Sequence, residues 1–240
     1  EKRPRPQDYG KVILNIFSER KKIAAVEFDH WLHRAKFTCR LCHVDIGFEM
    51  KAGATRITAE DNMNGLYCGT CHNGKMVIDG KVVFNACTKE LSQENLKTCS
   101  RCHSYGKEVK KEYNFATFTA KFPKERFGNG IDWEQAEKEG LIKPIDFIEG
   151  ISIKKGGMPI QGDFAVTAKI KGIPDIIFSH EKHTIWNGCE VCHPDIFNVG
   201  KGTTKYTMRD IFNGKFCGVC HGSVAFPNDD CKRCHVKPVM

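Results

Sequence analysis

Several features that many proteins contain are missing from this 240-residue chain. It has no run of about 18 apolar residues, so no transmembrane helix is expected. The first six residues, Glu1 to Pro6, form no apolar signal region, and any export signal is therefore expected to have been removed already. Hydrophobic residues make up only 40% of the chain, below the roughly 45–50% of typical soluble domains. The composition therefore argues against a fold that relies on an apolar core alone.

Familiar catalytic patterns are missing as well. The sequence shows no Gly-rich phosphate loop, no paired catalytic carboxylates and no Ser/His/Asp grouping above background. These absences favour a non-enzymatic function. Acidic residues are fewer than basic ones, 29 against 37, which gives a formal charge of +8. Taken alone, that charge suggests a nucleic acid or a membrane surface as partner.

Cysteine, by contrast, is abundant for a chain of this length, with 13 residues, alongside 10 histidines. Twelve of the cysteines fall into six copies of the pattern Cys-x-x-Cys-His. The copies are Cys39-Cys42-His43, Cys68-Cys71-His72, Cys99-Cys102-His103, Cys189-Cys192-His193, Cys217-Cys220-His221 and Cys231-Cys234-His235.

This pattern is the attachment signature of c-type haem. Two thiols three residues apart reach the two vinyl groups of one porphyrin, and the histidine that follows meets the iron from one side. Structural zinc sites also use paired cysteines, and a disulfide framework is a second alternative. Neither alternative explains a histidine after every pair, so six covalently attached c-type haems are expected.

The motifs form two groups of three, which indicates an internal duplication. Each group follows the same phrase, Phe-x-His-x-x-His, which places His30 and His33 before the first group and His180 and His183 before the second. In both groups the first cysteine comes nine residues after the first histidine of the pair. The segment 61–68 also aligns with 210–217.

The paired histidines followed by three haem motifs resemble the triheme cytochrome c7 class, relatives of tetrahaem cytochrome c3. Two such units in one chain resemble the c7-type polymers of metal-reducing and sulfur-reducing bacteria. The resemblance covers roughly residues 9–105 and 164–240. It implies a haem-dominated fold with low secondary structure, mainly short α-helices with small β-hairpins, as two c7-like triheme units in tandem. The expected domains are 1–112 and 164–240, joined by a connector, 113–163, that contains a short helix.

Six haems need twelve axial ligands, and the motif histidines supply one each. The duplicated pairs His30/His33 and His180/His183 are expected to supply four more, because a spacing of three residues puts both rings on one helical face. By resemblance to the c7 class, the first histidine of each pair serves the haem of the next motif. The second histidine then serves the middle haem of its group.

Two haems remain without a distal histidine. In the c7 class a third distal histidine lies four residues before the second motif, where this chain has Asn64 and Asn213. The last haem of each group, at His103 and His235, is therefore the deficient one. Methionine is the leading replacement. The candidates are Met63 and Met208, with Met50 in reserve, and a lysine such as Lys215 or a vacant position remains open.

The local patterns predict few elements. Val12–Phe17 and Ile23–Phe28 are expected to form a hairpin, and Phe164–Ile170 with Asp175–Phe178 its counterpart. Short helices are expected after Thr207 and from Asp132 to Gly140, with capping residues at their starts. The connector contains four phenylalanines, which suggest that it is packed: Phe115, Phe118, Phe122 and Phe127. Residues 154–163 are expected to form an exposed loop. Cys87, outside every motif, is expected to be a buried inert thiol, with an intermolecular disulfide as the alternative.

These patterns predict an electron-transfer protein that takes part in respiration, for example in metal or sulfur reduction. Its expected location is the periplasm, and an extracellular or outer-membrane-associated location is also open. Its expected partners are other redox proteins: cytochromes, and quinol-oxidising or terminal reductase complexes. Six haems with their propionates lower the charge from +8 to about +2 oxidised and about −4 reduced, which removes the case for nucleic acid. A monomer is expected. One alternative is a subunit of a haem-chain filament. The other is a reductase that uses a vacant iron at His103 or His235.

Overall fold

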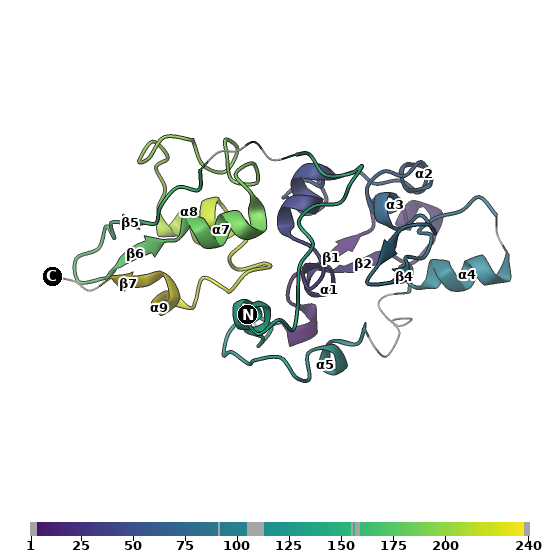
Figure 1. Ribbon diagram of the computed structural model, residues 1–240, viewed down its shortest axis with the longest axis horizontal. Helices are drawn as coiled ribbons and strands as arrows, with labels where there is room; N and C mark the ends of the chain where they lie inside the picture. Colours follow the sequence, from purple (N-terminus) through teal and green to yellow (C-terminus); the bar gives the residue numbers. More distant parts are fainter. Residues whose placement is uncertain (1–3, 91, 105–112, 155, 157–158, 238–240) are drawn as a thin grey trace.

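The computed structural model describes residues 4–90, 92–104, 113–154, 156 and 159–237. Over these residues the chain forms short helices and small antiparallel sheets joined by long irregular segments (Figure 1). This low content of regular structure confirms the expected fold class. The boundary expected at residue 112 lies outside the described residues.

The helices are short, and most span only one or two turns. They are α1 (His30–Arg34), α2 (Ala59–Met63), α3 (Cys68–Cys71), α4 (Gln93–Ser100), α5 (Phe115–Phe118), α6 (Trp133–Lys138), α7 (His180–Asn187), α8 (Met208–Phe212) and α9 (Cys231–Cys234). Leu41–Asp45 forms a π-helical turn. The 3-10 helices are Pro6–Asp8, Glu19–Lys21 and Phe216–Val219.

The strands form three small antiparallel sheets in the described part of the chain. They are β1 (Lys11–Leu14), β2 (Val26–Asp29), β3 (Val77–Ile78), β4 (Lys81–Val82), β5 (Phe164–Val166), β6 (Asp175–Phe178) and β7 (His235–Lys237). Strand β1 pairs with β2, β3 pairs with β4, and β6 lies between β5 and β7. Both expected hairpins are confirmed, with shorter first strands than the sequence suggested. The third strand β7, the hairpin β3–β4 and helix α4 were not predicted.

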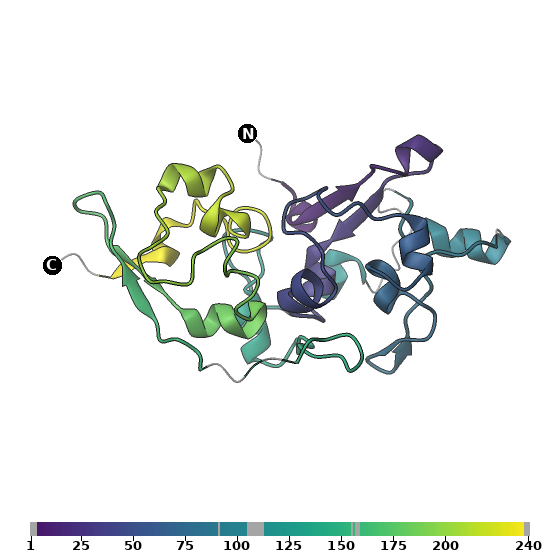
Figure 2. The same cartoon turned by 90° about the horizontal axis from the view of Figure 1, so that it is seen from above.

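The elements gather into two lobes (Figures 1 and 2). The first lobe, residues 4–104, runs from β1 to α4, and the second lobe, residues 159–237, runs from β5 to β7. In each lobe a hairpin leads directly into the helix that carries the histidine pair, β2 into α1 and β6 into α7. The repeated phrase in the sequence therefore produces a repeated strand-to-helix unit.

Helices α2 and α8 begin with the same cap. In α2 the Thr58 hydroxyl accepts a hydrogen bond from the Asp61 backbone N–H, and the Asp61 carboxylate accepts one from the Thr58 N–H. Thr207 and Asp210 repeat this reciprocal box at α8. Such a box fixes a helix start that five residues could not hold by propensity alone.

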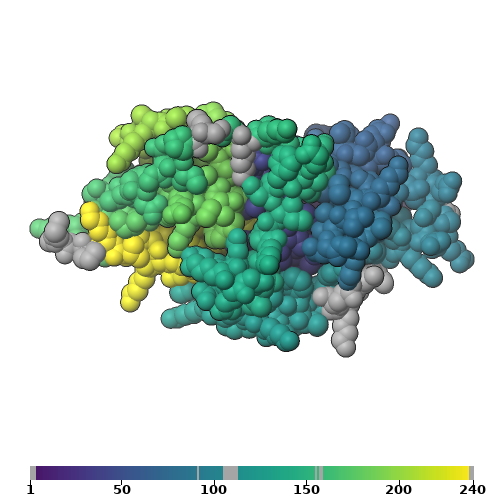
Figure 3. Space-filling view, viewed as in Figure 1, coloured from purple at the N-terminus to yellow at the C-terminus, as the bar shows by residue number. Residues whose placement is uncertain are grey.

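The connector, described over residues 113–154, is packed as expected. Trp133 and Ala136 of α6, with Ile131 and Ile142, form a buried cluster with Trp31 and Ala35 of the first lobe. Three of the predicted phenylalanines, Phe115, Phe118 and Phe122, pack against it. Figure 3 shows the connector, in teal, covering the boundary between the two lobes. The described residues of the predicted loop 154–163 are exposed.

The start of α6 matches its prediction in part. The Asp132 carboxylate accepts a hydrogen bond from the Gln135 backbone N–H at 3.0 Å, whereas the reciprocal arm of a capping box is not formed. Gly140 follows the end of the helix with φ +71°, a left-handed conformation that glycine adopts without steric cost.

Candidate functional site

Five of the six Cys-x-x-Cys-His motifs share one local geometry. In these five the histidine backbone N–H donates to the carbonyl oxygen of the first cysteine, as in one helical turn. The pairs are His72 to Cys68 (2.8 Å), His103 to Cys99 (2.9 Å), His193 to Cys189 (3.0 Å), His221 to Cys217 (3.0 Å) and His235 to Cys231. In the remaining motif His43 lies in the π-helical turn Leu41–Asp45. A helical turn places residues i, i+3 and i+4 on one side, so both thiols and the imidazole of a motif can serve one ligand.

The middle motif of each lobe carries a glycine after its first cysteine. A Cβ built on Gly69 would overlap the Asn62 carbonyl at the end of α2, and one on Gly218 would overlap the Ile211 carbonyl of α8. The first turn of each middle motif therefore lies directly against the preceding helix. Sequence reasoning missed this contact, although a glycine at the same position of both repeats was a visible signal.

The Nδ1 atoms of nine histidines lie within hydrogen-bond distance of a backbone carbonyl oxygen. The acceptors are Gly10 for His30 (2.6 Å), Asp29 for His33 (3.3 Å), Phe48 for His43 (2.8 Å), Ala24 for His103 (2.7 Å), Gly162 for His180 (3.3 Å), Ser179 for His183 (2.7 Å), Phe197 for His193 (2.6 Å), Phe226 for His221 (3.0 Å) and Pro174 for His235 (2.7 Å). The buried Nδ1 of His72 lies beside the backbone of Phe84 without full hydrogen-bond geometry.

These contacts fix the chemistry of the imidazoles. A carbonyl oxygen can only accept, so Nδ1 carries the proton in each bond and Nε2 keeps a free lone pair. This is the arrangement that orients histidine toward a metal. Burial lowers the pKa of His33 to about 4, helped by the neighbouring His72. Burial also lowers the pKa of His30, which the nearby His43 lowers further. Both rings are thus held neutral, the form that binds iron.

The second histidine of each pair faces the histidine of the middle motif. The ring centroids of His33 and His72 are 6.3 Å apart, and those of His183 and His221 are 6.2 Å apart. A histidine nitrogen lies about 2.0–2.1 Å from a bound first-row metal, and the ring centroid roughly 1.1 Å further back, so two rings on opposite sides of one iron have centroids about 6.3 Å apart. Both spacings match this expected separation, and the role of these four histidines as axial ligands stays a prediction.

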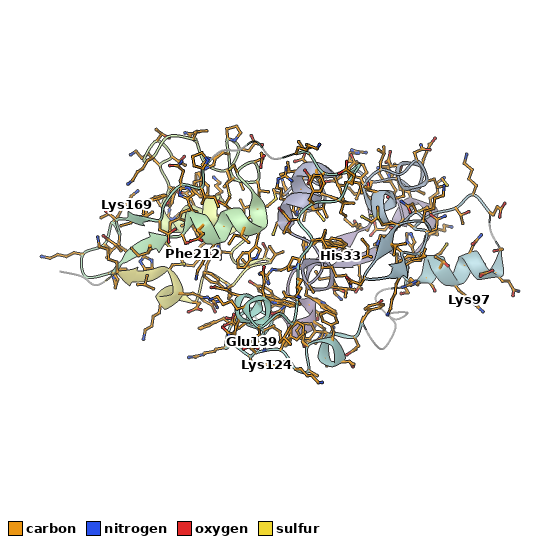
Figure 4. The ribbon with its side chains drawn as sticks, in the orientation of Figure 1. His33, Lys97, Lys124, Glu139, Lys169 and Phe212 are labelled. Atoms are coloured by element: carbon orange, nitrogen blue, oxygen red, sulfur yellow. The ribbon has the colours of Figure 1, made fainter. Side chains whose placement is uncertain are left out.

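Aromatic rings surround both of these pairs in the same way. Phe28 lies 4.4 Å from His33 and Phe178 lies 4.5 Å from His183, measured between centroids. On the opposite side, Phe84 lies 4.5 Å from His72 and Phe226 lies 4.3 Å from His221. These rings restrict the imidazoles to one orientation. Figure 4 shows His33 in the interior of the first lobe, whereas Lys97 lies on α4 at its outer end.

The thiols show which motifs are neighbours. Burial raises the pKa of the Cys42 thiol to about 12, and the nearby Cys71 of the second motif raises it further. Burial likewise raises the pKa of Cys68 to about 12, with a contribution from Cys102 of the third motif. In the second lobe burial raises the pKa of Cys217 to about 11, and Cys234 adds to the effect. In each lobe, therefore, thiols of the middle motif lie near thiols of a neighbouring motif.

The third motif of each lobe is held by an equivalent long-range bond. His103 donates to the Ala24 carbonyl and His235 to the Pro174 carbonyl, and both acceptors precede the second hairpin strand of their lobe. Asn64 and Asn213 occupy the C-cap positions of α2 and α8. Met63 ends α2, and Met208, which is 38% exposed, begins α8. Their role as ligands stays a prediction.

Cys87 is a free, partly buried thiol. The Asn62 side-chain amide lies 3.8 Å from its sulfur. Burial raises the pKa of the Cys87 thiol, and the contact with the Asn62 amide lowers it in part. The thiol is therefore less deeply buried than the sequence interpretation expected.

The residues fit covalently bound haem. Five motifs present two cysteines and a histidine on one helical turn, the first does so with a π-helical turn, and nine histidines have Nδ1 beside a backbone carbonyl oxygen. Across the described ranges, no group of three or more His, Cys, Asp or Glu side chains converges as a self-contained metal cluster. Nor does any helix of the described chain have the length and apolar character needed to cross a bilayer.

The known proteins to which this chain is similar are cytochromes. The sequence model described as "Cytochrome c7 and related cytochrome c" matches residues 26–112 and 176–236, more than half of the chain. The C-terminal hexaheme fragment of GSU1996 is 26% identical, over 98% of this chain and 99% of that one, with a TM-score of 0.28. A c7-type three-heme cytochrome domain is 39% identical, over 33% of this chain and 99% of that one, with a TM-score of 0.30. No curated protein matches.

The two matched regions coincide with the two groups of motifs and leave the connector between them. Cytochromes of this family carry electrons through c-type haem, and electron transfer, not catalysis, is their activity. The duplicated motifs, the oriented histidines and the two matched regions together show that this chain belongs to the family of cytochrome c7 and related cytochromes c.

Proposed function

We propose that the chain is a hexahaem cytochrome that relays or stores several electrons in periplasmic or extracellular respiration, with metal or sulfur reduction as an example. The observation that carries this proposal is the repeated spacing of the axial histidines, 6.3 Å for His33 and His72 and 6.2 Å for His183 and His221. Because the spacing is the same in both lobes, it supports one haem between each pair. The other four motifs share the same helical turn or its π-helical variant.

Each haem would be held by the two cysteines of its motif through thioether bonds and by the motif histidine through its iron. His30 and His180 would provide the distal ligands of the first haem in each unit, and His33 and His183 those of the middle haem. The proposed units are residues 1–112 and 164–240, with 113–163 as the connector.

When bound, haem supplies a reversible one-electron couple between ferric and ferrous iron. The chain's own residues hold the imidazoles neutral and pack phenyl rings around them, and each Nε2 would be available to the iron. Apolar packing of this kind excludes water, and it lets ligand type and burial tune the potential of each site. A spread of potentials along adjacent sites suits a relay or a multi-electron store.

The last haem of each unit, at His103 and His235, is the one for which we propose Met63 and Met208 as sixth ligands. Thioether ligation raises the potential relative to two histidines. In each case the methionine lies on the capped helix, α2 or α8, that packs against the middle motif through Gly69 or Gly218. A helix fixed in this way is a suitable support for a ligand.

The experiment that tests the function is a stoichiometric reductive titration of the purified holoprotein. The proposal expects six electrons per chain, transferred reversibly and spread over a range of potential, with rapid exchange to small redox proteins. Fewer than six electrons, or no exchange with any redox partner, would contradict it. Carbon monoxide binding to the native ferrous protein, with turnover of nitrite or peroxide, would instead favour a reductase.

A further inference from the structure

Arg40 is the first variable residue of the first motif, and its guanidinium is completely buried. Nη1 lies 2.9 Å from the Asp45 carboxylate, whose side chain is also fully buried. Nη2 donates to the Ile153 carbonyl of the connector at 3.0 Å. The Asp45 carboxylate in turn accepts the Ile153 backbone N–H at 3.1 Å. Arg40 therefore ties the first motif to the connector.

A third contact of Arg40 reaches the second lobe. Its Nε lies 3.6 Å from the Glu190 carboxylate and has no closer hydrogen-bond partner in the described part of the chain. Glu190 occupies, in the fourth motif, the same position that Arg40 occupies in the first. Equivalent positions of the two repeats thus carry opposite charges that face each other.

The backbone at Gly188 lies very close to the Arg40 and Glu190 side chains. A Cβ on Gly188 would lie 2.7 Å from Cδ of Arg40 and 2.8 Å from the Glu190 carboxylate, and Gly188 has φ +65°. Only glycine fits both the space and the backbone conformation. In the same region Cys39 of the first motif lies near Cys192 of the fourth and Cys220 of the fifth.

The helices that carry the histidine pairs meet beside this contact. The Arg34 guanidinium of α1 lies between the rings of Trp133 and Trp186, 5.3 Å from each centroid. The Trp186 indole N–H of α7 donates to the Glu137 carboxylate of α6 at 2.7 Å. Helix α6 therefore connects α1 and α7, in the part of the connector that covers the boundary in Figure 3.

We propose that Arg40 is a positioning residue that holds the first motif of one unit against the first motif of the other, so that electrons pass between the units through the sites of His43 and His193. The inference rests on the proposed hexahaem function. An arginine suits this position because its planar fork donates to two acceptors while it faces the Glu190 carboxylate, whereas a lysine ammonium is a point charge that cannot span them. Its burial is tolerated because Asp45 compensates the charge.

Two variants of the full-length holoprotein test the proposal. Glu190→Gln removes the charge that attracts Arg40 across the boundary, at a side chain that is 50% exposed, and should not affect folding. Arg40→Lys keeps a cation beside Asp45 but loses the fork. Glu181→Gln, an exposed carboxylate on α7, is the matched control. The readout is proton NMR of the haem methyl groups in half-reduced protein, where fast internal electron exchange averages each methyl to one signal.

The expected result is severalfold slower exchange between the units in Glu190→Gln and Arg40→Lys, seen as selective broadening of the methyl signals of the first and fourth haems. Glu181→Gln should behave like the unmodified chain. Averaged signals that stay sharp in both variants, with six haems bound, would overturn the role of Arg40. A protein without six haems would instead refute the proposed function itself, so the two failures are distinguishable.

Discussion

At the scale of single residues, Gly69 and Gly218 show how tightly the middle motifs are built. Each is the residue after the first cysteine, and each lies against a backbone carbonyl of the preceding helix. The corresponding residues of the other four motifs are arginine, serine, glutamate and lysine, which have side chains. The middle site therefore has a steric requirement that the attachment chemistry alone does not impose.

We predict that Gly69→Ala destabilises the holoprotein by at least about 1–3 kcal/mol, because the added methyl group must displace the end of α2. Guanidinium unfolding followed by circular dichroism measures the effect. Gly156→Ala is the control, since a Cβ at Gly156 has nothing within 4 Å. Equal stability of the two variants would contradict a steric requirement for glycine at position 69.

A second residue-scale prediction concerns the sixth ligands. Replacing Met63 or Met208 with leucine should remove half of the weak far-red absorption that iron–thioether bonds give in oxidised cytochromes, and the double variant should remove all of it. The potential of the affected haem should fall or become sensitive to added imidazole. Met76→Leu, at a methionine that is not a candidate ligand, is the control. An unchanged far-red spectrum in the double variant would argue for another ligand or a vacant position.

At the scale of elements, α2 and α8 depend on their caps. Thr58→Ala and Thr207→Ala should each cost about 0.5–2 kcal/mol, because each leaves the backbone N–H of Asp61 or Asp210 without its acceptor. Denaturant unfolding measures the loss. Thr58→Ser and Thr207→Ser keep the hydroxyl and should restore most of it. If the serine variants were as unstable as the alanine ones, the caps would not be the cause.

Elements also show what the sequence could and could not predict. The histidine pairs, both hairpins and the cap of α8 followed from local patterns, and all are present. Strand β7 was not predictable because it pairs with β6 across about 60 residues and follows the last motif directly. Helix α4 was missed although Ser92 caps it, because its eight residues show no clear apolar stripe. Its capping serine was a signal that could have been used.

Some features of the candidate site could be predicted from the sequence, and others could not. The cysteines and histidines were evident from spacing, because attachment chemistry requires that spacing. His33 and His72 lie with their ring centroids 6.3 Å apart, and their shared haem, which the family resemblance implied, stays a prediction. The partners of Arg40 could not have been predicted, since variable motif positions carry no attachment signal and Ile153 and Glu190 are more than 100 residues away. Such contacts depend on how the lobes meet.

At the scale of the whole molecule, the N-terminal segment also joins the two lobes. The Tyr9 hydroxyl donates to the Ala225 carbonyl of the second lobe at 2.5 Å. The Gly128 backbone of the connector and Pro227 lie beside the same tyrosine ring. Arg233 of the second lobe pairs with Glu125 of the connector. Tyr9 and Arg40 therefore both make contacts across the boundary.

Tyr9 gives the molecule a pH dependence on the alkaline side. Burial raises the pKa of its hydroxyl from 10.0 to about 12. The folded pKa is above the unfolded one, so the contribution of Tyr9 to stability is complete below pH 10 and is lost as pH rises toward about 12. Thermal unfolding followed by circular dichroism at several pH values should show this loss. Tyr9→Phe should be less stable at neutral pH and lose less between pH 10 and 12; parallel profiles for both proteins would contradict the assignment.

The account depends most on six covalent haems in one chain. The direct test is the intact mass of the purified, exported protein combined with its haem absorbance after alkaline pyridine treatment. We expect a red protein whose mass exceeds the 27.1 kDa of the polypeptide by six haem groups and whose absorbance gives six haems per chain. A colourless protein with bound zinc, or a mass that accounts for fewer than six haems, would contradict the account.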